Sequence, residues 1–344
     1  MSDVAGDPYI SIVELSKAFQ NKSVLPSEVV DAQLKRIEVI DKKLGSYQTV
    51  YKDTAMASAK EADLALANEQ RLGPFHGIPF ALKDIFELEG HVTTCGSQEM
   101  LQRISRTTGT IVRRLVDAGG ILIGKTKTVE CALGGWGTNE HMGTPWNPWD
   151  LKEARVPGGS SSGSGVAVAS GIASCATGSD TGGSVRLPAA YCGLTGLKVS
   201  KACLPTDGIM PLSQTLDTPG PMTRNMADLA FMFSIMQGLN ANKLENDMLN
   251  GRGLFDIHIN IFKGLRLGII SEEERFRCTE DILKSYDTTL NLLVELGAEL
   301  KVFNPPIPYD DMTNLNGAIT MFEGYLNHRS FYDDPKKQMD QNVK

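Results

Sequence analysis

The stretch Gly158-Gly-Ser-Ser-Ser-Gly-Ser-Gly165, followed by Gly178-Ser-Asp-Thr-Gly-Gly-Ser-Val-Arg186, decides how this chain of 344 residues is interpreted. Both segments place serines among glycines. Glycine allows the backbone to approach a ligand closely and to turn without a side-chain penalty. Exposed serine hydroxyls next to backbone N–H groups are what acyl transfer to serine requires. The two segments therefore predict a site built from hydroxyls and backbone N–H groups.

A flexible linker is the ordinary interpretation of a glycine- and serine-rich run. Here the run leads directly into Val166-Ala-Val-Ala-Ser-Gly-Ile-Ala173, which has the composition of a buried helix. A glycine-rich loop that enters a helix N-terminus can hold an anion or an oxyanion. The continuation therefore favours a functional loop. The whole irregular stretch 137–165 is also long for a compact domain, which again favours function.

Outward from this region, helix and strand patterns alternate. We expect two helices within 12–44, broken near Leu25-Pro26, with Ser27 opening the second and Gly45 ending it. Further helices are predicted at 54–69, 110–118 and 283–296, and strands at 80–84, 121–124 and 299–303, with a polar insertion at 241–263. This alternation predicts an α/β fold with a mixed, mainly parallel central β-sheet covered by helices on both faces. One domain over residues 1–344 is expected.

Composition excludes several classes of protein. A hydrophobic content of 41% and a charged content of 22% are ordinary for a soluble globular protein. The net charge of −7 argues against a nucleic-acid-binding surface. No apolar run is long enough to span a membrane, and the acidic start, Met1–Asp7, is unlike a signal peptide. We therefore predict a cytoplasmic protein with no membrane partner and no direct nucleic-acid partner.

The cysteines and histidines indicate neither disulfides nor metal. Six cysteines are scattered without a CxxC pair, so reduced thiols are expected. The five histidines form no HExxH motif and no tight cluster with cysteine. The predictions are no metal site and no cofactor.

Lys83, in Gly77-Ile-Pro-Phe-Ala-Leu-Lys-Asp84, is the candidate base. A lysine at a strand end usually extends to solvent, but the apolar residues before it favour burial. Lowering a lysine pKa from about 10.4 to near 7 costs roughly 4 to 5 kcal/mol, which burial can supply. Adjacent strand residues point to opposite faces, so Asp84 is not expected to contact Lys83.

The segment from Asp180 to Arg186 supplies the second half of the site. Gly182 and Gly183 free the backbone to aim successive N–H groups at one point, which would form an oxyanion hole beside the Ser184 hydroxyl. Asp180 and Arg186 are predicted to hold this loop by a bidentate ion pair.

Two other motifs fit less well. Gly159–Gly163 satisfies G-x-S-x-G, centred on Ser161, but residues 150–157 do not resemble the strand that this nucleophile elbow needs. Only His258 and His328 follow it as possible bases. The nucleotide-binding P-loop needs a lysine after its last glycine, where this chain has Val166.

Together the motifs resemble those of the amidase signature family, the Ser-cisSer-Lys hydrolases. The resemblance extends from about residue 9 to 240, with the core motifs between 74 and 200. It is carried by seven segments in order: Gly77-Ile-Pro-Phe-Ala-Leu-Lys-Asp84, Gly124-Lys-Thr126, Asn147-Pro-Trp149, Pro157-Gly-Gly-Ser-Ser-Ser-Gly-Ser164, Gly178-Ser-Asp-Thr-Gly-Gly-Ser-Val-Arg186, Pro188-Ala-Ala190 and Gly193-Leu-Thr-Gly-Leu-Lys198.

The resemblance implies a role for each site residue. Ser184 would be the acyl-forming nucleophile, Ser160 the bridging serine in a cis peptide, and Lys83 the buried base. The oxyanion hole and substrate pocket would then be formed by Thr181, Gly182, Gly183, Ser184, Ser160 and Ala132. The implied activity is hydrolysis of a carboxamide C–N bond in a linear amide. The apolar segment 131–136 favours a small nonpolar or aryl amide as the substrate.

Two alternatives remain open at this level. Family members usually continue past the position of Lys344, so we expect the C-terminal part to be incomplete, with 336–344 resembling a helix cut short. The chain could then be an inactive remnant. It could also be the amidase (A) subunit of a glutamyl-tRNA amidotransferase, which releases ammonia from glutamine. A small amide is the expected partner molecule, and a homodimer the expected assembly.

Overall fold

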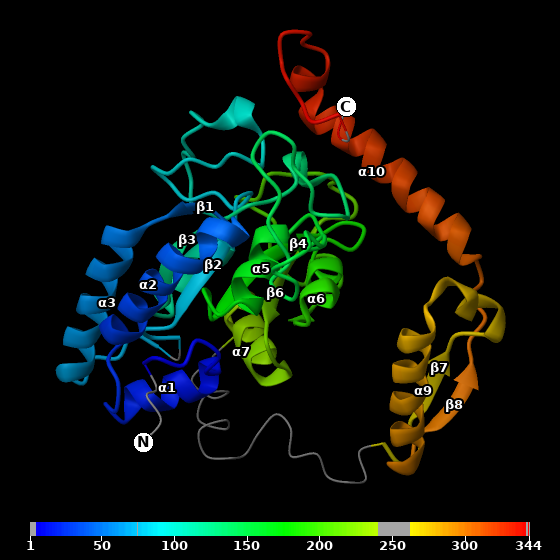
Figure 1. The fold of residues 1–344 in the computed structure, drawn as a ribbon, viewed down its shortest axis with the longest axis horizontal. Helices are drawn as coiled ribbons and strands as arrows, with labels where there is room; N and C mark the ends of the chain where they lie inside the picture. Colours follow the sequence, from blue (N-terminus) through cyan, green and yellow to red (C-terminus); the bar gives the residue numbers. More distant parts are fainter. Residues whose placement is uncertain (1–4, 74, 240–261, 342, 344) are drawn as a thin grey trace. The chain divides into compact units, whose positions relative to one another are not determined.

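The computed structural model describes residues 5–73, 75–239, 262–341 and 343 (Figure 1). The chain divides into two compact units: unit 1 comprises Met1–Asn250 and Gly317–Lys344, and unit 2 comprises Gly251–Asn316. The insertion predicted at 241–263 falls almost wholly outside the described residues. The organisation of 1–344 as one domain stays a prediction.

Unit 1 is built on a six-stranded sheet in the order β1-β3-β2-β4-β6-β5. The strands are β1 (Tyr47–Val50), β2 (Pro79–Lys83), β3 (Ile121–Thr126), β4 (Cys175–Asp180), β5 (Thr195–Gly196) and β6 (Thr218–Thr223). Strand β2 runs parallel to both β3 and β4, and the outer pairs are antiparallel. The predicted mixed sheet is confirmed, but its parallel pairing is confined to the centre.

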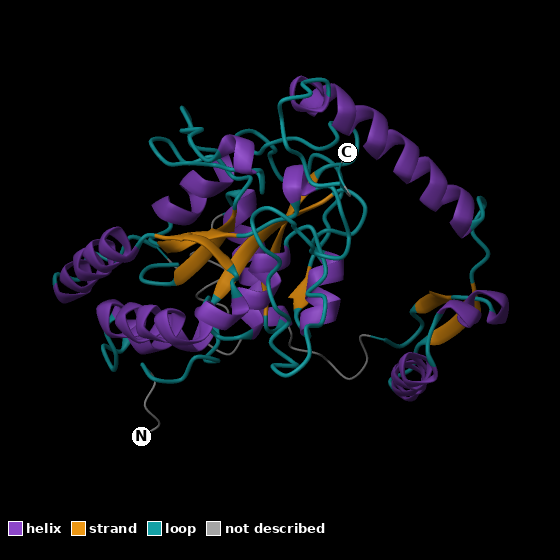
Figure 2. Ribbon diagram, turned by 45° about the horizontal axis from the view of Figure 1, so that its top comes forward, coloured by secondary structure: helices purple, strands orange, loops and turns teal. Residues whose placement is uncertain are grey.

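Helices cover both faces of this sheet, as predicted (Figure 2). They are α1 (Ile12–Gln20), α2 (Pro26–Leu44), α3 (Lys52–Ala67), α4 (Thr110–Asp117), α5 (Ser162–Ala169), α6 (Arg186–Cys192) and α7 (Met226–Gln237). Phe80 and Leu82 of β2 pack in the core formed with α1, α4 and α7, whereas Ala81 packs with α2, α3 and α5. Strand side chains alternate between faces, so Lys83 shares the α5 side with Ala81.

Most predicted elements agree closely with the structure. Gly45 ends α2 in the left-handed conformation, with φ 59°. Ser27, however, does not open this helix: Pro26 is its first residue and Leu25 its N-cap. Proline suits that position because its φ is already helical and it has no N–H to leave unpaired. The buried helix predicted at 166–173 starts earlier, at Ser162.

Unit 2 is smaller and its described residues are mostly exposed. Its strands β7 (Arg266–Ile269) and β8 (Glu299–Val302) pair in parallel, with η3 (Glu272–Arg277) and α9 (Glu280–Glu295) between them in the chain. Helix α10 (Tyr309–Tyr332) begins in unit 2 and continues into unit 1. The helix-like end expected at 336–344 is wrong for the described residues, which form turns or irregular chain beyond Tyr332. No helix in the described ranges is long and apolar enough to cross a membrane.

Gly163, in the first turn of α5, is expected to be important for stability because its backbone is closely packed. A Cβ there would lie 2.2 Å from the Ser46 carbonyl oxygen and 2.5 Å from the Lys127 backbone nitrogen. Both are backbone atoms, so Gly163→Ala should lower the free energy of unfolding in urea by about 1–3 kcal/mol or more. Gly317→Ala, where a Cβ meets nothing within 4 Å, is the control. Equal stability of the two variants would contradict this close approach.

Candidate active site

The side chain of Lys83 lies at the centre of the site. It is the last residue of β2, and the residue is fully buried. Its Nζ donates to the hydroxyls of Ser160, at 2.8 Å, and of Ser179, at 2.9 Å. Both serines come from segments far along the chain from Lys83. The fold therefore joins β2, the serine-rich stretch and β4 at one amine.

Ser160 is held rigidly beside this amine. The peptide bond between Gly159 and Ser160 is cis. The Ser160 carbonyl accepts from the Thr128 hydroxyl at 2.9 Å and from the Val129 N–H at 3.2 Å. The Ser160 residue is fully buried. Its hydroxyl therefore faces Lys83 from a backbone that is fixed by its neighbours.

The environment of Lys83 favours the neutral form of its amine. Burial lowers the pKa of Lys83 to about 7, and the acidic groups Cys95, Asp217 and Asp180 oppose this shift more weakly. An ordinary lysine has a pKa of about 10.4 and is almost wholly protonated at neutral pH. Near neutral pH, a substantial fraction of Lys83 can therefore accept a proton.

Asp84 does not pair with Lys83, as predicted. Its carboxylate accepts from the Thr94 N–H at 3.1 Å and from the Thr94 hydroxyl, and lies 3.2 Å from Lys125 Nζ. Asp84 and Lys125 are both buried. The charge of Asp84 is thus compensated locally, which limits its ability to stabilise a proton on Lys83.

The predicted clamp between Asp180 and Arg186 is present. Arg186 donates from Nε at 3.0 Å and from a terminal guanidinium nitrogen at 2.9 Å to the two carboxylate oxygens. The N–H groups of Gly183 and Val185 also donate to this carboxylate, at 2.8 and 3.1 Å. Burial alone would raise the pKa of Asp180, but these hydrogen bonds and the Arg186 charge hold it below its ordinary value. The loop that carries Ser184 therefore folds around one ionised carboxylate.

This arrangement limits which N–H groups of the loop could form the predicted oxyanion hole. The Gly183 N–H is engaged by Asp180, so it does not point to a ligand in this structure. Within the described residues, the N–H groups of Gly182 and Ser184 make no hydrogen bond to protein. Ser184 is 8% exposed, and its carbonyl accepts from the Ser161 N–H at 3.3 Å. The described residues show no hydrogen bond between the Ser160 and Ser184 hydroxyls, so the bridging role of Ser160 between Lys83 and Ser184 stays a prediction.

The backbone around Ala132, the residue that the family resemblance assigns to the substrate pocket, has unusual geometry. Ala132 and Cys131 lie in the short helix η2 (Glu130–Ala132), and both have positive φ, 59° and 52°. Cys95 also has φ 52°, and its carbonyl accepts from the Cys131 N–H at 2.8 Å. Positive φ is costly for residues other than glycine and persists where the surroundings enforce it, often at functional sites. All three residues are buried.

Sequence reasoning missed two residues of the site. Ser179, the second partner of Lys83, was visible within Gly178-Ser-Asp180 but received no role. Alternation along a strand ending at Asp180 could have placed Ser179 and Thr177, which accepts from the Lys83 N–H, on one face. Asp217 accepts from the Thr181 hydroxyl. No local pattern around Asp217 indicates that contact.

The structure does not support a nucleophile elbow centred on Ser161. Residues 150–157 form no strand, and the Ser161 hydroxyl donates to the Ser179 carbonyl at 3.4 Å.

All six cysteines are free thiols. Among the described residues, no group of three His, Cys, Asp or Glu side chains is placed to hold a metal.

A lysine amine buried against serine hydroxyls is an arrangement in which a serine-dependent hydrolase could activate its nucleophile. The family model described as Amidase matches residues 28–343. The chain belongs to this amidase family of hydrolases, as its motifs indicated.

The chain is similar to several curated proteins. It is 37% identical over 295 residues to the A subunit of a glutamyl-tRNA(Gln) amidotransferase from Prochlorococcus marinus (strain MIT 9211), covering 85% of this chain and 60% of that protein. It is 34% identical over 301 residues to a 2-amino-5-chloromuconic acid deaminase of Comamonas testosteroni, covering 88% and 62%. The chain therefore spans about 60% of the length of these relatives.

Among solved structures, the native peptide amidase of Stenotrophomonas maltophilia superposes with a TM-score of 0.79 and 28% identity. The match covers 94% of this chain and 67% of that one. A structure described only as an amidase gives a TM-score of 0.84 with 27% identity, covering 97% and 72%.

Because the pKa of Lys83 is lowered, we expect the free energy of unfolding to depend on pH, which can be measured whether or not the protein is active. Unfolded lysine keeps its proton to a pH of about 10.4, whereas the native group releases it near 7, so the unfolded state binds more protons between these values. The free energy of unfolding should rise by up to about 4 to 5 kcal/mol across that window. Lys83→Met should lose this rise relative to wild type.

The measurement is urea unfolding at pH 7 and at pH 9.5, with the exposed Lys60→Met as the matched control. Lys60→Met should follow the wild-type pH dependence. If Lys83→Met also follows it, Lys83 does not have a lowered pKa.

Proposed function

We propose that this protein is an amidase that hydrolyses the C–N bond of a small, nonpolar or aryl, linear carboxamide, with Ser184 as nucleophile, Ser160 as bridge and Lys83 as base. The observation that carries the proposal is the 2.8 Å hydrogen bond from Lys83 Nζ to Ser160 Oγ inside a buried site. Family membership supports the same chemistry.

In the proposed mechanism, neutral Lys83 takes a proton from Ser160 as Ser160 takes the proton of Ser184. The Ser184 oxygen attacks the amide carbonyl carbon. Backbone N–H groups of the loop 181–184 stabilise the resulting oxyanion, with Gly182 and Ser184 as the direct donors. Gly183 contributes by holding the loop to Asp180.

The C–N bond then breaks as the same relay returns the proton to the departing amine. This leaves an acyl group on Ser184. Water, deprotonated through Ser160 and Lys83, attacks the acyl carbon and releases the carboxylic acid. Each proton taken up by Lys83 is given back, so the scheme needs no cofactor.

We base the preference for a nonpolar substrate on the apolar composition around Ala132, which is itself buried in the main hydrophobic core. The adjacent Cys131 is in an apolar cluster with Met339 and Val343, and Leu133, Phe331 and Tyr332 pack against it. Apolar side chains favour an apolar acyl group, because its burial removes hydrocarbon from water.

A second candidate is the A subunit of a glutamyl-tRNA amidotransferase. The observation in its favour is the 37% identity to a relative of that name. In that role the chain would release ammonia from glutamine as a member of an assembly. A homodimer and a cytoplasmic location stay predictions.

Ammonia release by the protein alone, from aryl amides and from glutamine, separates these candidates. We expect release from aryl amides. Ser184→Ala should lower kcat by several orders of magnitude because it removes the nucleophile. Ser160→Ala should cost less, because water can replace a bridging hydroxyl. Release from glutamine alone would favour the amidotransferase role, and a folded Ser184→Ala variant with wild-type turnover would contradict the assignment.

The pH dependence of activity tests the base. With a Lys83 pKa of about 7, kcat/KM should rise through neutral pH to an alkaline plateau. Lys83→Arg should be nearly inactive at every pH, because a guanidinium stays protonated and cannot act as a base. An arginine variant that retains most of the activity would show that positive charge, rather than proton transfer, is needed at this position.

A further inference from the structure

The second half of helix α10 packs on the loop 211–217. The Glu323 carboxylate accepts from the Thr215 N–H at 3.0 Å, from the Thr215 hydroxyl at 2.5 Å and from the Ser213 hydroxyl. Hydrogen bonds to an ionised acceptor are stronger than those between neutral groups. The hydrogen bonds from Ser213 and Thr215 lower the pKa of Glu323, in keeping with an ionised carboxylate.

The neighbouring turn of α10 adds to this contact. The Asn327 side-chain amide donates to the Leu212 carbonyl at 3.0 Å, and His328 Nε2 lies 2.9 Å from the Pro211 carbonyl. His328 is buried. Three side chains of one helix therefore hold one loop through its polar groups.

The same loop holds Thr181 of the oxyanion segment. One carboxylate oxygen of Asp217 accepts from the N–H groups of Leu212 and Ser213, at 2.8 and 3.0 Å. The other oxygen accepts from the Thr181 hydroxyl. Ser213 and Asp217 thus connect Glu323 to Thr181 through a continuous series of hydrogen bonds.

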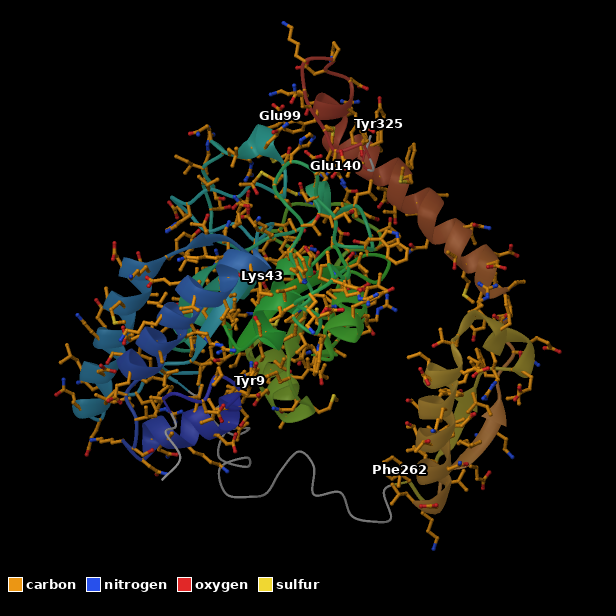
Figure 3. All side chains as sticks on the ribbon, in the orientation of Figure 1. Tyr9, Lys43, Glu99, Glu140, Phe262 and Tyr325 are labelled. Carbon is orange, nitrogen blue, oxygen red and sulfur yellow. The ribbon has the colours of Figure 1, made fainter. Side chains whose placement is uncertain are left out.

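The chain that follows α10 is also held to other residues of unit 1. The Asp340 N–H donates to the buried Glu130 at 2.6 Å, and the Glu140 N–H donates to Asp340 at 2.9 Å. Lys337 pairs with Glu99 at 2.7 Å. Figure 3 shows the labelled Glu99 and Glu140 beside the end of α10. Helix α10 and the residues that follow it therefore contact both the loop 211–217 and the short helix η2, which carries Ala132.

We propose that Glu323 and Asp217 are positioning residues that hold the oxyanion loop 181–184 in the geometry needed to stabilise the transition state. The proposal rests on the proposed function of Ser184. Neither carboxylate is assigned a contact with the substrate. Glu323 holds the loop 211–217 in place, and Asp217 connects that loop to the Thr181 hydroxyl, one residue before the Gly182 N–H.

The test compares Glu323→Gln, Asp217→Asn and the double variant with wild type. Each is assayed for kcat and KM on an aryl amide, and for binding of a trifluoromethyl ketone that adds to Ser184 to form a tetrahedral oxyanion. We expect each single variant to lower kcat and ketone affinity by a similar factor, about tenfold, with KM nearly unchanged. The double variant should lose less than the product of the single losses, because both residues act through one series of contacts.

Glu61→Gln, on the exposed surface of α3, is the matched control and should behave as wild type. Thr215→Val is the milder variant if Glu323→Gln does not fold, since it removes one hydroxyl donor and keeps the N–H; a smaller loss of the same kind is expected. Independent effects that multiply in the double variant, or a loss confined to KM, would overturn the proposal.

Hydrogen–deuterium exchange separates failure of this proposal from failure of the proposed function. If the wild type hydrolyses no amide and the ketone does not bind, the function of Ser184 is wrong. The coupling can still be read from peptides that cover 181–187 and 211–217. Glu323→Gln should speed exchange in both, and Glu61→Gln in neither. Unchanged exchange at 181–187 would overturn the positioning role whether or not the protein is active.

Discussion

A lysine amine enclosed by protein is the constraint on which the rest of this structure depends. Lys83 can act as a base only while it is kept from water and from unpaired acids. The central position of β2 supplies the first condition, because β3 and β4 flank it and helices cover both faces. The second condition is met by pairing: Asp84 faces Lys125, and Asp180 faces Arg186. Each of these two carboxylates has its own cation. Asp217, which opposes the lowering of the Lys83 pKa more weakly than burial drives it, instead accepts hydrogen bonds from Thr181, Leu212 and Ser213.

The same constraint explains why the partners of Lys83 are hydroxyls. A serine hydroxyl satisfies a buried amine by hydrogen bonding without adding a charge that would restore the ordinary pKa. Ser160 and Ser179 approach it from different segments, so two hydrogen bonds orient the amine without adding a charge. Gly163 in the serine-rich stretch allows this segment to pack closely against the rest of unit 1, because its backbone lies against the carbonyl of Ser46.

Several helices and strands and the candidate site could be predicted from the sequence where local residue patterns indicate them. Apolar periodicity located α2, alanine- and glutamate-rich composition located α3, and an apolar run after a turn located β2. The glycine-framed serines located the candidate site. Strands β4 and β6 were missed for physical reasons. β4 is rich in Gly, Ser and Asp, which have low strand propensity, and β6 carries Pro219 and Pro221, which usually exclude a strand from a sheet interior. The Pro221 carbonyl accepts from Leu197 beside β5, so the missing N–H groups face the two-residue edge strand rather than β4. Contacts such as Glu323 with Thr215 depend on tertiary folding, and no local pattern predicts them.

The discontinuity of unit 1 has a consequence for the order in which the protein is made. Synthesis proceeds from the N-terminus, and domains begin to fold as they emerge. Lys83, Ser160 and Ser184 all leave the ribosome before unit 2, whereas Glu323 follows it. A nascent chain can thus assemble its sheet while the loop 211–217 still lacks its hydrogen bonds to α10. If Glu323 supports the loop 181–184 as we propose, that loop gains its last supporting contact only after Glu323 has been synthesised.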